Sequence, residues 1–360
     1  MTDSATKWRL YTENQEAWLD MLADCARAKE SIVLEQFIFV NDEFGQKLLN
    51  ICASRAAEGV KVRFLWDAAG SFTFWGSNIA EDLKKKGIEL TFWKTLIPSY
   101  FKVPNFRSWY FRNHRRTLVI DDQIGYTGSL CIDQRFKNWR DTNVRLEGSI
   151  VRQMKNAFER MWARAIGGRK IPPKRTSLRA EFQYLTNYPA PGRRYVYSSL
   201  LDAVRRAKDR IFITTPYFVP THRLTRTLTA AAERGVEVRL IIPEKSDHPT
   251  VDLGARSFFK KLLTSGVRIF LYSGNMIHNK AAIVDDTWAT IGSMNLDSAS
   301  LLYNFEANIV TTNDKFAEEL VEHFKKDLEE SKEVSLTEWQ NRFFLEKIPE
   351  ILIRLVRKFL

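Results

Sequence analysis

The chain has 360 residues, of which 44% are hydrophobic, and this length and composition suit two packed domains. Its 3 cysteines show neither a disulfide framework nor the spacing of a zinc site, and no segment offers the roughly 18 uncharged apolar residues that a membrane-spanning helix needs. The formal net charge of +12 favours an anionic partner, either nucleic acid or an acidic membrane surface, although a basic enzyme without such a partner is also compatible with it.

The first part of the chain alternates between helix and strand. A helix end runs into a β-rich strand within residues 27–40, a second helix stops at Gly59 before the strand 60–65, and a third stops at Gly87. Glycine commonly ends a helix because it adopts the left-handed backbone conformation at no steric cost. This order of elements predicts an α/β sheet that is built from parallel crossovers.

A basic and aromatic segment, residues 94–112, follows these elements. It contains 15 residues that have no counterpart in the second half of the chain, and its aromatic side chains are interleaved with cations. Two interpretations stay open: a surface loop that packs on its own aromatic side chains, or a lip of the active site.

The first chemical motif follows this segment. His114 and Arg116 stand two residues apart before an apolar stretch, Asp121 lies five residues beyond Arg116, and a Gly-Ser pair begins seven residues beyond Asp121. The apolar stretch is typical of a strand, and side chains two apart on a strand share a face. We therefore expect His114 and Arg116 to point the same way and Asp121, at odd spacing, to point elsewhere.

The second half of the chain repeats this order of elements. Residues 206–219 match 27–40, and helices again stop at Gly235 and Gly266. Between the halves, near 165–185, Gly-Gly and Pro-Pro pairs interrupt the pattern. The duplication predicts an α/β fold of two similar lobes, each a mixed, mostly parallel sheet flanked by helices, related by a pseudo-two-fold axis with the active site at their interface. The predicted units are residues 1–168, 169–335 and 336–360.

The second motif repeats the first in the same spacing. His278, Lys280 and Asp285 take the places of the first histidine, cation and aspartate, and Ser293 and Asn295 follow. Two such units that face each other would bring two imidazoles and two cations into one pocket. Such a set of side chains can bind a phosphate group and catalyse its transfer.

These side chains can cleave and transfer a phosphodiester without a metal ion or another cofactor. Two cations offset the charge of the phosphate and of the transition state. One imidazole can attack phosphorus and hold the phosphoryl group covalently. The other can protonate the leaving alkoxide and then deprotonate the incoming alcohol or water.

Each imidazole also needs an acceptor that orients its remote nitrogen. Candidates occur at matching distances, one in each half: Asp141 lies 27 residues after His114, and Glu306 lies 28 residues after His278. The predicted catalytic set is His114, Arg116, Asp121, His278, Lys280 and Asp285, in which the two aspartates are expected to have a structural role. The predicted phosphate-binding or orienting set is Ser129, Asp141, Ser293, Asn295 and Glu306.

At these residues the sequence resembles the phospholipase D superfamily, whose mark is a duplicated H-x-K-x4-D followed by G-S-x-N. The second copy fits completely, whereas the first has Arg116 in place of Lys and Cys131 in place of Asn. Arg keeps the charge and can grip phosphate in a bidentate manner, but Cys131 loses a donor. The resemblance narrows to the bacterial cardiolipin synthases, in a form without N-terminal membrane helices, through the stretches 139–148, 213–220, 245–249, 254–257, 288–297 and 304–308.

The resemblance implies transphosphatidylation. His114 would attack one phosphatidylglycerol to give a phosphatidyl-histidine and glycerol, and His278 would deprotonate a hydroxyl of a second phosphatidylglycerol to give cardiolipin. Anionic phospholipids would then be the partners, nucleic acid would not be one, and an active-site lip at 94–112 would touch acyl chains or the lipid interface. The sequence leaves the acceptor and the oligomeric state open.

Two other functions stay open at this point. A phosphodiesterase or nuclease of the same superfamily would use water as the acceptor, and the positive charge of the chain would suit DNA. A degenerate lipid-binding homologue would have lost its chemistry through the changes at Arg116 and Cys131.

The C-terminal residues 336–360 predict an amphipathic helix. Apolar and basic side chains fall on opposite sides of it: Ile348, Ile351, Leu352, Leu355 and Phe359 against Arg354, Arg357 and Lys358. Such a helix lies in an anionic interface or packs on the domain, and the aromatic residues Trp339, Phe343 and Phe344 favour the interface. Because the N-terminus shows no secretory signal, the expected location is peripheral, on the cytoplasmic face of the bacterial inner membrane.

Deletion of residues 346–360 is expected to release the protein from anionic liposomes, because it removes the apolar face of this helix together with its cations. Co-sedimentation with vesicles rich in phosphatidylglycerol measures the bound fraction, and neutral vesicles give the background. Equal binding of the truncated and the full-length chain would contradict a membrane-bound helix.

Overall fold

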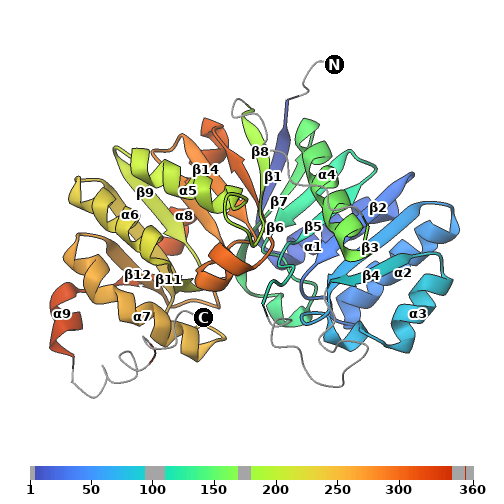
Figure 1. The fold of residues 1–360 in the computed structure, drawn as a ribbon, viewed down its shortest axis with the longest axis horizontal. Coiled ribbons are helices and arrows are strands. Elements are labelled where there is room, and N and C mark those ends of the chain that lie inside the picture. Colours follow the sequence, from blue (N-terminus) through green and yellow to red (C-terminus); the bar gives the residue numbers. More distant parts are fainter. Residues whose placement is uncertain (1–4, 94–109, 169–179, 343–352, 354–360) are drawn as a thin grey trace.

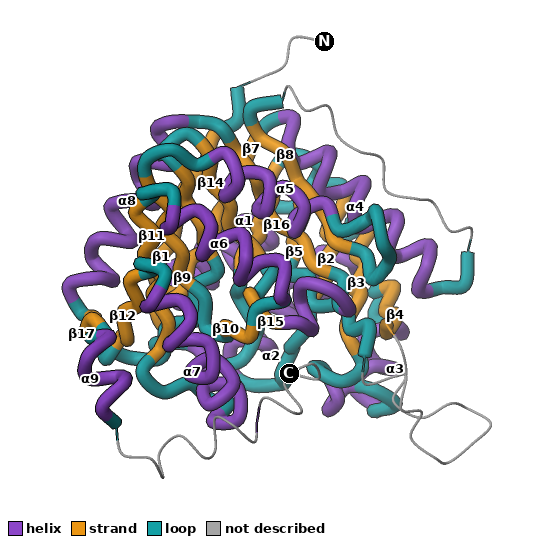
Figure 2. The backbone as a smooth tube through the Cα atoms, turned by 60° about the vertical axis from the view of Figure 1, so that its left-hand side comes forward, coloured by secondary structure: helices purple, strands orange, loops and turns teal. Residues whose placement is uncertain are grey.

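The computed structural model describes residues 5–93, 110–168, 180–342 and 353, and these form two α/β lobes that stand side by side (Figure 1). The first lobe comes from the blue and green part of the chain and the second from the yellow and red part. Each lobe has one large sheet covered by helices, as the orange strands and purple helices of Figure 2 show. The predicted fold of two similar α/β lobes is confirmed.

The first lobe holds a seven-stranded sheet in the order β1-β7-β6-β5-β2-β3-β4. Strands β2, β3 and β4 pair in parallel through crossovers that contain α2 and α3, and the remaining neighbours pair antiparallel. The elements are β1 (Lys7–Glu13), α1 (Asn14–Ala26), β2 (Ser31–Gln36), α2 (Glu43–Ala57), β3 (Lys61–Asp67), α3 (Asn78–Lys85), β4 (Glu89–Trp93), β5 (Thr117–Ile120), β6 (Ile124–Gly128), η3 (Gln134–Phe136), β7 (Arg140–Glu147) and α4 (Ser149–Ala165).

The second lobe holds an eight-stranded sheet in the order β17-β12-β11-β9-β13-β14-β16-β8, and β10 pairs with β15 beside it. Its elements are β8 (Phe182–Asn187), α5 (Tyr195–Arg206), β9 (Arg210–Thr214), β10 (Phe218–Val219), α6 (His222–Glu233), β11 (Glu237–Pro243), α7 (Pro249–Thr264), β12 (Arg268–Tyr272), β13 (Ala281–Val284), β14 (Trp288–Gly292), β15 (Leu296–Asp297), β16 (Glu306–Thr311), α8 (Asp314–Glu329), β17 (Ser331–Glu333) and α9 (Leu336–Asn341).

Both sheets are mixed, but the expectation that they are mostly parallel was wrong. Parallel pairing is confined to β2-β3-β4 and β9-β11-β12 in the two large sheets of the described chain. Each motif strand instead turns back into the next strand through a short turn, in which Asp121 and Asp285 have φ of 52° and 50°. A short turn reverses the chain and gives antiparallel pairing, whereas a parallel partner requires a long crossover.

The core joins the two lobes. One cluster of buried apolar side chains includes α4 and α8 and strands from both sheets, for example Val119 and Ile283 of the two motif strands. Separate clusters fill the space under α1 to α3 in the first lobe and under α5 to α7 in the second. Because the first cluster is continuous, the two lobes are packed as one body with their motif strands on either side of the junction.

Helix ends follow the sequence signals. Helix α2 begins where the side chain of Asp42 accepts a hydrogen bond from the backbone N–H of Gly45, and α6 begins in the same way at Thr221. Both stop before a glycine in the left-handed region, Gly59 with φ of 93° and Gly235 with φ of 92°. The predicted helix ends at Gly59 and Gly235 are therefore confirmed.

The C-terminal part of the described chain packs on the second lobe. In α9 the Trp339 ring lies 4.7 Å from the Phe259 ring of α7, so this tryptophan contributes to the domain itself. The predicted interfacial helix, most of the insert 94–112 and the boundary near 168/169 lie outside the described residues, and these stay predictions. No helix among the described residues is long and apolar enough to cross a membrane.

Candidate active site

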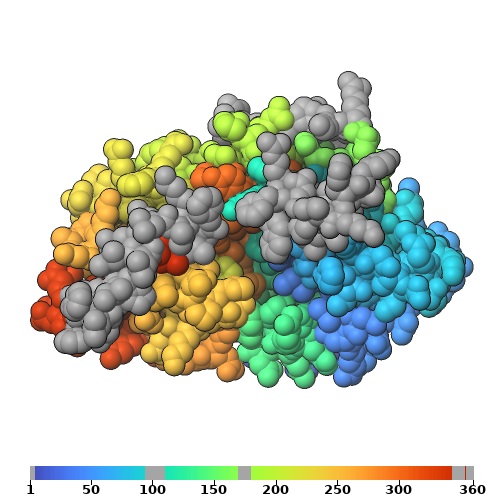
Figure 3. Space-filling model, turned by 60° about the horizontal axis from the view of Figure 1, so that its bottom comes forward, coloured from blue at the N-terminus to red at the C-terminus, as the bar shows by residue number. Residues whose placement is uncertain are grey.

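The motif strands bring their histidines and cations to the junction of the lobes. Strand β5 lies between β2 and β6, and β13 lies between β9 and β14, with each histidine three residues before its strand. His114 and His278 are 9% and 7% exposed, and Arg116 and Lys280 are 4% and 3% exposed. Figure 3 shows a face of the molecule on which the blue and green first lobe meets the yellow and orange second lobe.

Each cation lies against the histidine of its own motif, so the two-residue spacing was interpreted correctly. Arg116 Nη2 is 3.1 Å from His114 Nε2, and Lys280 Nζ is 3.0 Å from His278 Nε2. Each cation also donates to the carbonyl oxygen of the same histidine, at 2.9 and 2.8 Å. The Nε2 atom of each imidazole therefore faces positive charge, which is where a phosphate oxygen would bind.

The carboxylates that orient the imidazoles come from the opposite lobe. His114 Nδ1 lies 2.9 and 3.2 Å from the two carboxylate oxygens of Glu306, and His278 Nδ1 lies 3.3 Å from Asp141 Oδ2. Asp141 and Glu306 were predicted as the orienting pair, and both are in this position. Their grouping with the motif of their own half, however, was wrong.

Backbone pairing explains the exchange of carboxylates. The His114 N–H donates to Phe305 O at 2.9 Å, and the His278 N–H donates to Arg140 O at 2.8 Å. Phe305 and Arg140 are the residues immediately before Glu306 and Asp141. Each histidine thus pairs with the chain segment of the other lobe that carries its carboxylate, and neither half of the site is complete without both lobes.

The serines of the motifs hold these carboxylates in place. Ser129 Oγ donates to Asp141 Oδ1, and Ser293 Oγ donates to Glu306 Oε2 at 2.5 Å. Both serines thus orient the carboxylates, and their donation to a phosphate stays a prediction. Asn295 is 3% exposed, and its Oδ1 has no hydrogen-bond partner among the described residues.

Cys131 takes part in holding the unusual cation of the first motif. Arg116 Nε donates to Cys131 Sγ at 3.4 Å, and the thiol is 2% exposed. This bond fixes one edge of the guanidinium group, while Nη1 and Nη2 reach the backbone and ring of His114. The two departures from the family pattern are therefore one unit, in which a planar cation and a sulfur acceptor take the places of Lys and Asn.

The motif aspartates hold the ends of the motif strands. Asp121 accepts the backbone N–H groups of Lys29, Glu30 and Ser31 at 2.7–2.9 Å. Asp285 accepts those of Lys208, Asp209 and Arg210, at the start of β9, at 2.9–3.0 Å. Their structural role was predicted correctly, and their inclusion among the catalytic residues is corrected, because each lies at the end of its strand opposite to the histidine.

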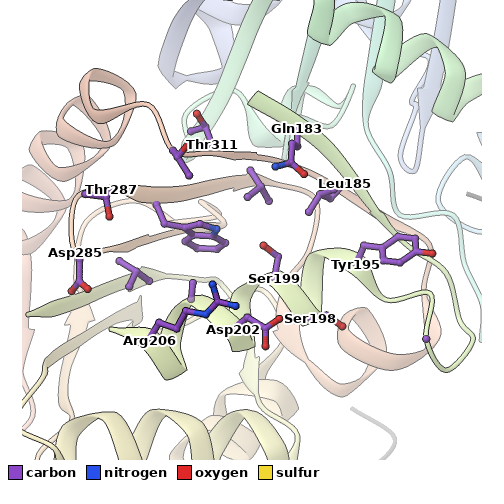
Figure 4. Close-up of a pocket in the computed structure, with 16 residues that line it drawn as sticks. Gln183, Leu185, Tyr195, Ser198, Ser199, Asp202, Arg206, Asp285, Thr287 and Thr311 are labelled. Atoms are coloured by element: carbon purple, nitrogen blue, oxygen red, sulfur yellow. The ribbon is translucent and has the colours of Figure 1, made fainter. Parts of the chain in front are cut away.

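The neighbourhood of Asp285 supports this separation. A cavity of about 620 Å³ lies between α5 and the sheet, and Asp285 lines it together with Trp288 and Arg206. Figure 4 shows Asp285 beside Thr287 at one side of this cavity, across from Tyr195. No motif histidine lines this cavity.

Burial decides the protonation of the site. Burial first, and then the charges of the nearby cations, lower the pKa of His114 and His278 although the carboxylates act in the opposite direction, and the pKa of His278 falls to about 4. Burial and the charge of Arg116 lower the pKa of Lys280 to about 7. Burial alone would raise the pKa of Asp141, but the hydrogen bond with His278 and the charges of His278 and Lys280 outweigh it and bring the pKa to about 2.

A neutral imidazole that donates its Nδ1 proton to a carboxylate keeps a lone pair on Nε2. Each motif histidine can therefore act as a nucleophile or a base at its Nε2 atom. Arg116 lowers the pKa of His278 and Lys280 lowers that of His114, so each cation is also close to the imidazole of the other motif. One phosphate can interact with both halves of the site.

The walls around the two histidines differ. The Phe37 ring meets His114 edge-on at 4.7 Å. His278 has three aromatic neighbours, Phe136 at 6.2 Å, Trp139 at 5.3 Å and Tyr217 at 6.3 Å. We call these three rings the aromatic wall. Among the described residues, His114 has fewer such neighbours.

The sequence analysis missed a buried ion pair that positions the first motif. Asp67 is 0% exposed and accepts a hydrogen bond from Arg112 Nε at 2.9 Å and from the Asn113 backbone N–H at 2.9 Å. These two residues lead directly into His114. The signal was available, because Asp67 is a charged residue at the carboxyl end of an apolar strand, where functional groups commonly lie in α/β sheets.

Comparison with known families agrees with this geometry. The family model described as "Cardiolipin synthase, PLD-like domain" matches residues 21–162 and 200–328, one range in each lobe. With its duplicated motifs joined in one site, the chain is an enzyme of the phospholipase D superfamily. Within that superfamily, it belongs to the family of cardiolipin synthase PLD-like domains.

Relatives cover nearly the whole chain. "Cardiolipin synthase 2" of Bacillus anthracis is 33% identical over an alignment that covers 99% of this chain and 71% of that protein. A cardiolipin synthase of Clostridium perfringens is 31% identical over 96% of this chain and 75% of that protein. The solved phosphatidylserine synthase of Haemophilus influenzae has the same fold, with a TM-score of 0.73 at 16% identity over 98% of this chain and 92% of that chain.

The Arg116–Cys131 contact leads to a double-mutant test. Arg116→Lys and Cys131→Asn are each expected to lower kcat/KM about tenfold, because each leaves one member of the pair without its partner. The double variant rebuilds the combination of the second motif and is expected to recover most of that loss. Steady-state rates of the four proteins give the coupling energy. If the losses in kcat/KM of the two single variants were additive in the double variant, Arg116 and Cys131 would not act as a pair.

Stability is expected to fall as the pH is lowered from about 6.5 to about 4. In this range a histidine of the unfolded chain binds a proton, whereas His278, with a pKa of about 4, does not. The unfolded state thus binds more protons, so the free energy of unfolding rises with pH. At about 1.4 kcal/mol per pKa unit, His278 accounts for on the order of 3 kcal/mol.

Thermal unfolding across this pH range measures the effect. The double variant His114→Gln, His278→Gln is expected to have a flatter profile of Tm against pH. The matched control is His222→Gln, an exposed histidine at the start of α6, which should leave the slope unchanged. If the double variant had the same slope of Tm against pH as the parent, the buried motif histidines would not be the cause of the pH dependence.

Proposed function

We propose that this protein is a cardiolipin synthase, a phosphatidyltransferase that joins two phosphatidylglycerol molecules through a phosphohistidine intermediate. The observation that carries the proposal is the crossed site: two buried imidazoles, each with a cation at Nε2 and a carboxylate of the other lobe at Nδ1. Membership of the cardiolipin synthase family supports a phospholipid as the substrate.

In the first half of the reaction, His114 Nε2 attacks the phosphorus of phosphatidylglycerol. The new N–P bond replaces the P–O bond to glycerol, and His278 gives a proton to the leaving oxygen. A phosphodiester anion between the motifs raises the pKa of His278, because an opposite charge favours the imidazolium form. Arg116 and Lys280 stabilise the charge that builds on the equatorial oxygens.

In the second half, the hydroxyl of another phosphatidylglycerol takes the place of the departed glycerol. His278 removes its proton, the oxygen attacks phosphorus, and the N–P bond breaks with its electron pair returning to His114. Glu306 keeps the His114 ring in one orientation in both steps through its two oxygen contacts. The assignment of His114 as the nucleophile follows the order of the motifs in the family that the sequence resembles.

The location that we propose is peripheral, on the cytoplasmic face of the bacterial inner membrane. The formal charge of +12 supports contact with anionic lipids. Part of this charge lies in a surface groove along α6 lined by Arg205, Arg223, Arg226 and Arg234. Such a surface adds electrostatic attraction to a membrane without any spanning segment.

The geometry of the first motif argues against a degenerate lipid-binding role. Arg116 makes the same two contacts with His114 that Lys280 makes with His278, and Cys131 occupies the remaining edge of its guanidinium group. Loss of function would remove the selection that preserves these matched contacts. Hydrolysis with water as the acceptor is the competing reaction at the same site.

Incubation of the protein with labelled phosphatidylglycerol in mixed vesicles tests the proposal. Cardiolipin and free glycerol are the expected products, resolved from phosphatidic acid by chromatography. His114→Ala and His278→Ala are each expected to lower the rate at least a thousandfold, because they remove the nucleophile and the proton donor. Phosphatidic acid as the sole product would replace the synthase function by a phospholipase function, and near-normal turnover of either variant would contradict the two-imidazole mechanism.

A further inference from the structure

Beyond the motifs, a polar group lies at the edge of the aromatic wall around His278. Tyr217 has its ring 6.3 Å from that of His278, and its hydroxyl donates to Asp247 Oδ1 at 2.6 Å. The other carboxylate oxygen of Asp247 lies 3.6 Å from His248 Nε2, and the His248 ring is 5.3 Å from the Tyr217 ring. We call these three residues, Tyr217, Asp247 and His248, the acceptor rim.

The rim is open to solvent but fixed in position. The side chains of Asp247 and His248 are 36% and 59% exposed. Their loop is held by Ser246, whose hydroxyl accepts the His248 N–H at 3.0 Å and whose own N–H donates to Asp252 at 2.9 Å. The loop ends at the start of α7. A ligand can therefore reach polar atoms whose positions are already set, which is the condition for selective binding.

The rim also faces the first lobe. The pKa of Arg135 in η3 is raised, first by its hydrogen bond with Asp133 and also by the charge of Asp247. Phe136, next to Arg135, stacks near His278. Asp247 of the second lobe and Arg135 of η3 are thus close enough to interact, and each is next to or bonded to a residue whose ring lies near His278.

Tyr217 serves to position the carboxylate. Burial raises the pKa of Tyr217, and the charge of Asp247 raises it further, so the hydroxyl stays protonated and donates. This bond uses part of one carboxylate oxygen and leaves the remaining lone pairs of Asp247 for other donors. His248 adds a second polar group beside them.

We propose that the acceptor rim binds the hydroxyl groups of a polyol headgroup and so selects the alcohol that His278 deprotonates. A carboxylate next to an imidazole accepts and donates the hydrogen bonds that neighbouring hydroxyls offer. The polyol is glycerol, either free or as the headgroup of phosphatidylglycerol. This inference rests on the proposed function, because it concerns the acceptor of the phosphatidyl group.

The difference between the lobes places the rim on the His278 side of the site. Residues 27–40 and 206–219 correspond in the repeat, and Ile38 stands where the second lobe has Tyr217. The first lobe thus has no hydroxyl at this position of the repeat, and among the residues that the structure describes the ring of Phe37 lies beside that of His114. Because the arriving alcohol takes the place of the departed glycerol beside His278, the rim lies on the side of the site that both alcohols occupy.

In the step that this rim assists, one hydroxyl of the polyol reaches His278 while a second hydroxyl donates to Asp247. His278 takes the proton of the first hydroxyl, its oxygen forms the P–O bond, and the P–N bond to His114 breaks. The proton on His278 then leaves to solvent, and His114 regains its lone pair. The rim binds and orients the acceptor and exchanges no proton itself.

Competition between two alcohols tests the proposal with the full-length protein. Phosphatidylglycerol vesicles receive labelled glycerol or ethanol, and cardiolipin, labelled phosphatidylglycerol and phosphatidylethanol are measured separately. Because the acceptors compete for one phosphatidyl-enzyme, the ratio of their products reports the acceptor step. Asp247→Ala is expected to lower the ratio of the polyol products to phosphatidylethanol about tenfold, since a site built to bind a hydroxyl discriminates strongly. Asp247→Asn keeps an acceptor for Tyr217 and should lose less.

Two further variants separate positioning from general damage. Tyr217→Phe keeps the ring beside His278 but releases Asp247, so the KM for glycerol should rise with little change in kcat. The matched control is Asp202→Ala, an aspartate on α5 that is 51% exposed and paired with Arg205, and it should behave as the parent.

The outcomes distinguish the two proposals. Equal polyol preference in the parent and in Asp247→Ala would overturn the acceptor rim and leave the synthase function intact. An equal loss with glycerol, phosphatidylglycerol and ethanol would also overturn it, because that pattern reports damage to the catalytic site. A loss with the lipid acceptor alone would place recognition on its second phosphate instead of the polyol. A parent that forms only phosphatidic acid would overturn the synthase function and the rim with it.

Discussion

Each motif histidine is held by the opposite lobe, through a hydrogen bond from its backbone N–H and a contact between its Nδ1 atom and a carboxylate. The two partners of one histidine are neighbours in the chain, Phe305 with Glu306 and Arg140 with Asp141. Movement of one lobe against the other would therefore displace an imidazole and its orienting acid together. The chemistry depends on this exchange, since a nucleophile and an acid that serve the same phosphate need a fixed separation.

Buried ion pairs stiffen the segments that make the exchange. Arg140 Nε contacts Asp327 of α8 at 2.6 Å, which ties the first lobe to a helix of the second. Arg112 contacts Asp67 just before the first motif. Removal of one partner from a buried pair typically costs about 3–5 kcal/mol, because it leaves an uncompensated charge. The loss of either partner would therefore destabilise the segments that hold His114 and His278 in place.

The two halves have a common framework and different details. Both have a cation on Nε2, a serine on the carboxylate and an aspartate at the end of the strand. The first half adds the Arg116–Cys131 contact, and the second adds an aromatic wall with a polar rim. The proposed reaction uses the two halves differently, because His114 carries the phosphatidyl group while both alcohols pass beside His278.

Local pattern was sufficient for much of this protein. The repeat, the helix ends at Gly59 and Gly235, the common face of histidine and cation, and the structural role of the motif aspartates all follow from periodicity and neighbouring residues. Tertiary structure decided which carboxylate orients which imidazole, because the partners lie 192 and 137 residues apart. Matching distances along the chain could identify both acids as candidates. They could not reveal that backbone pairing between the lobes brings each acid to the histidine of the other half.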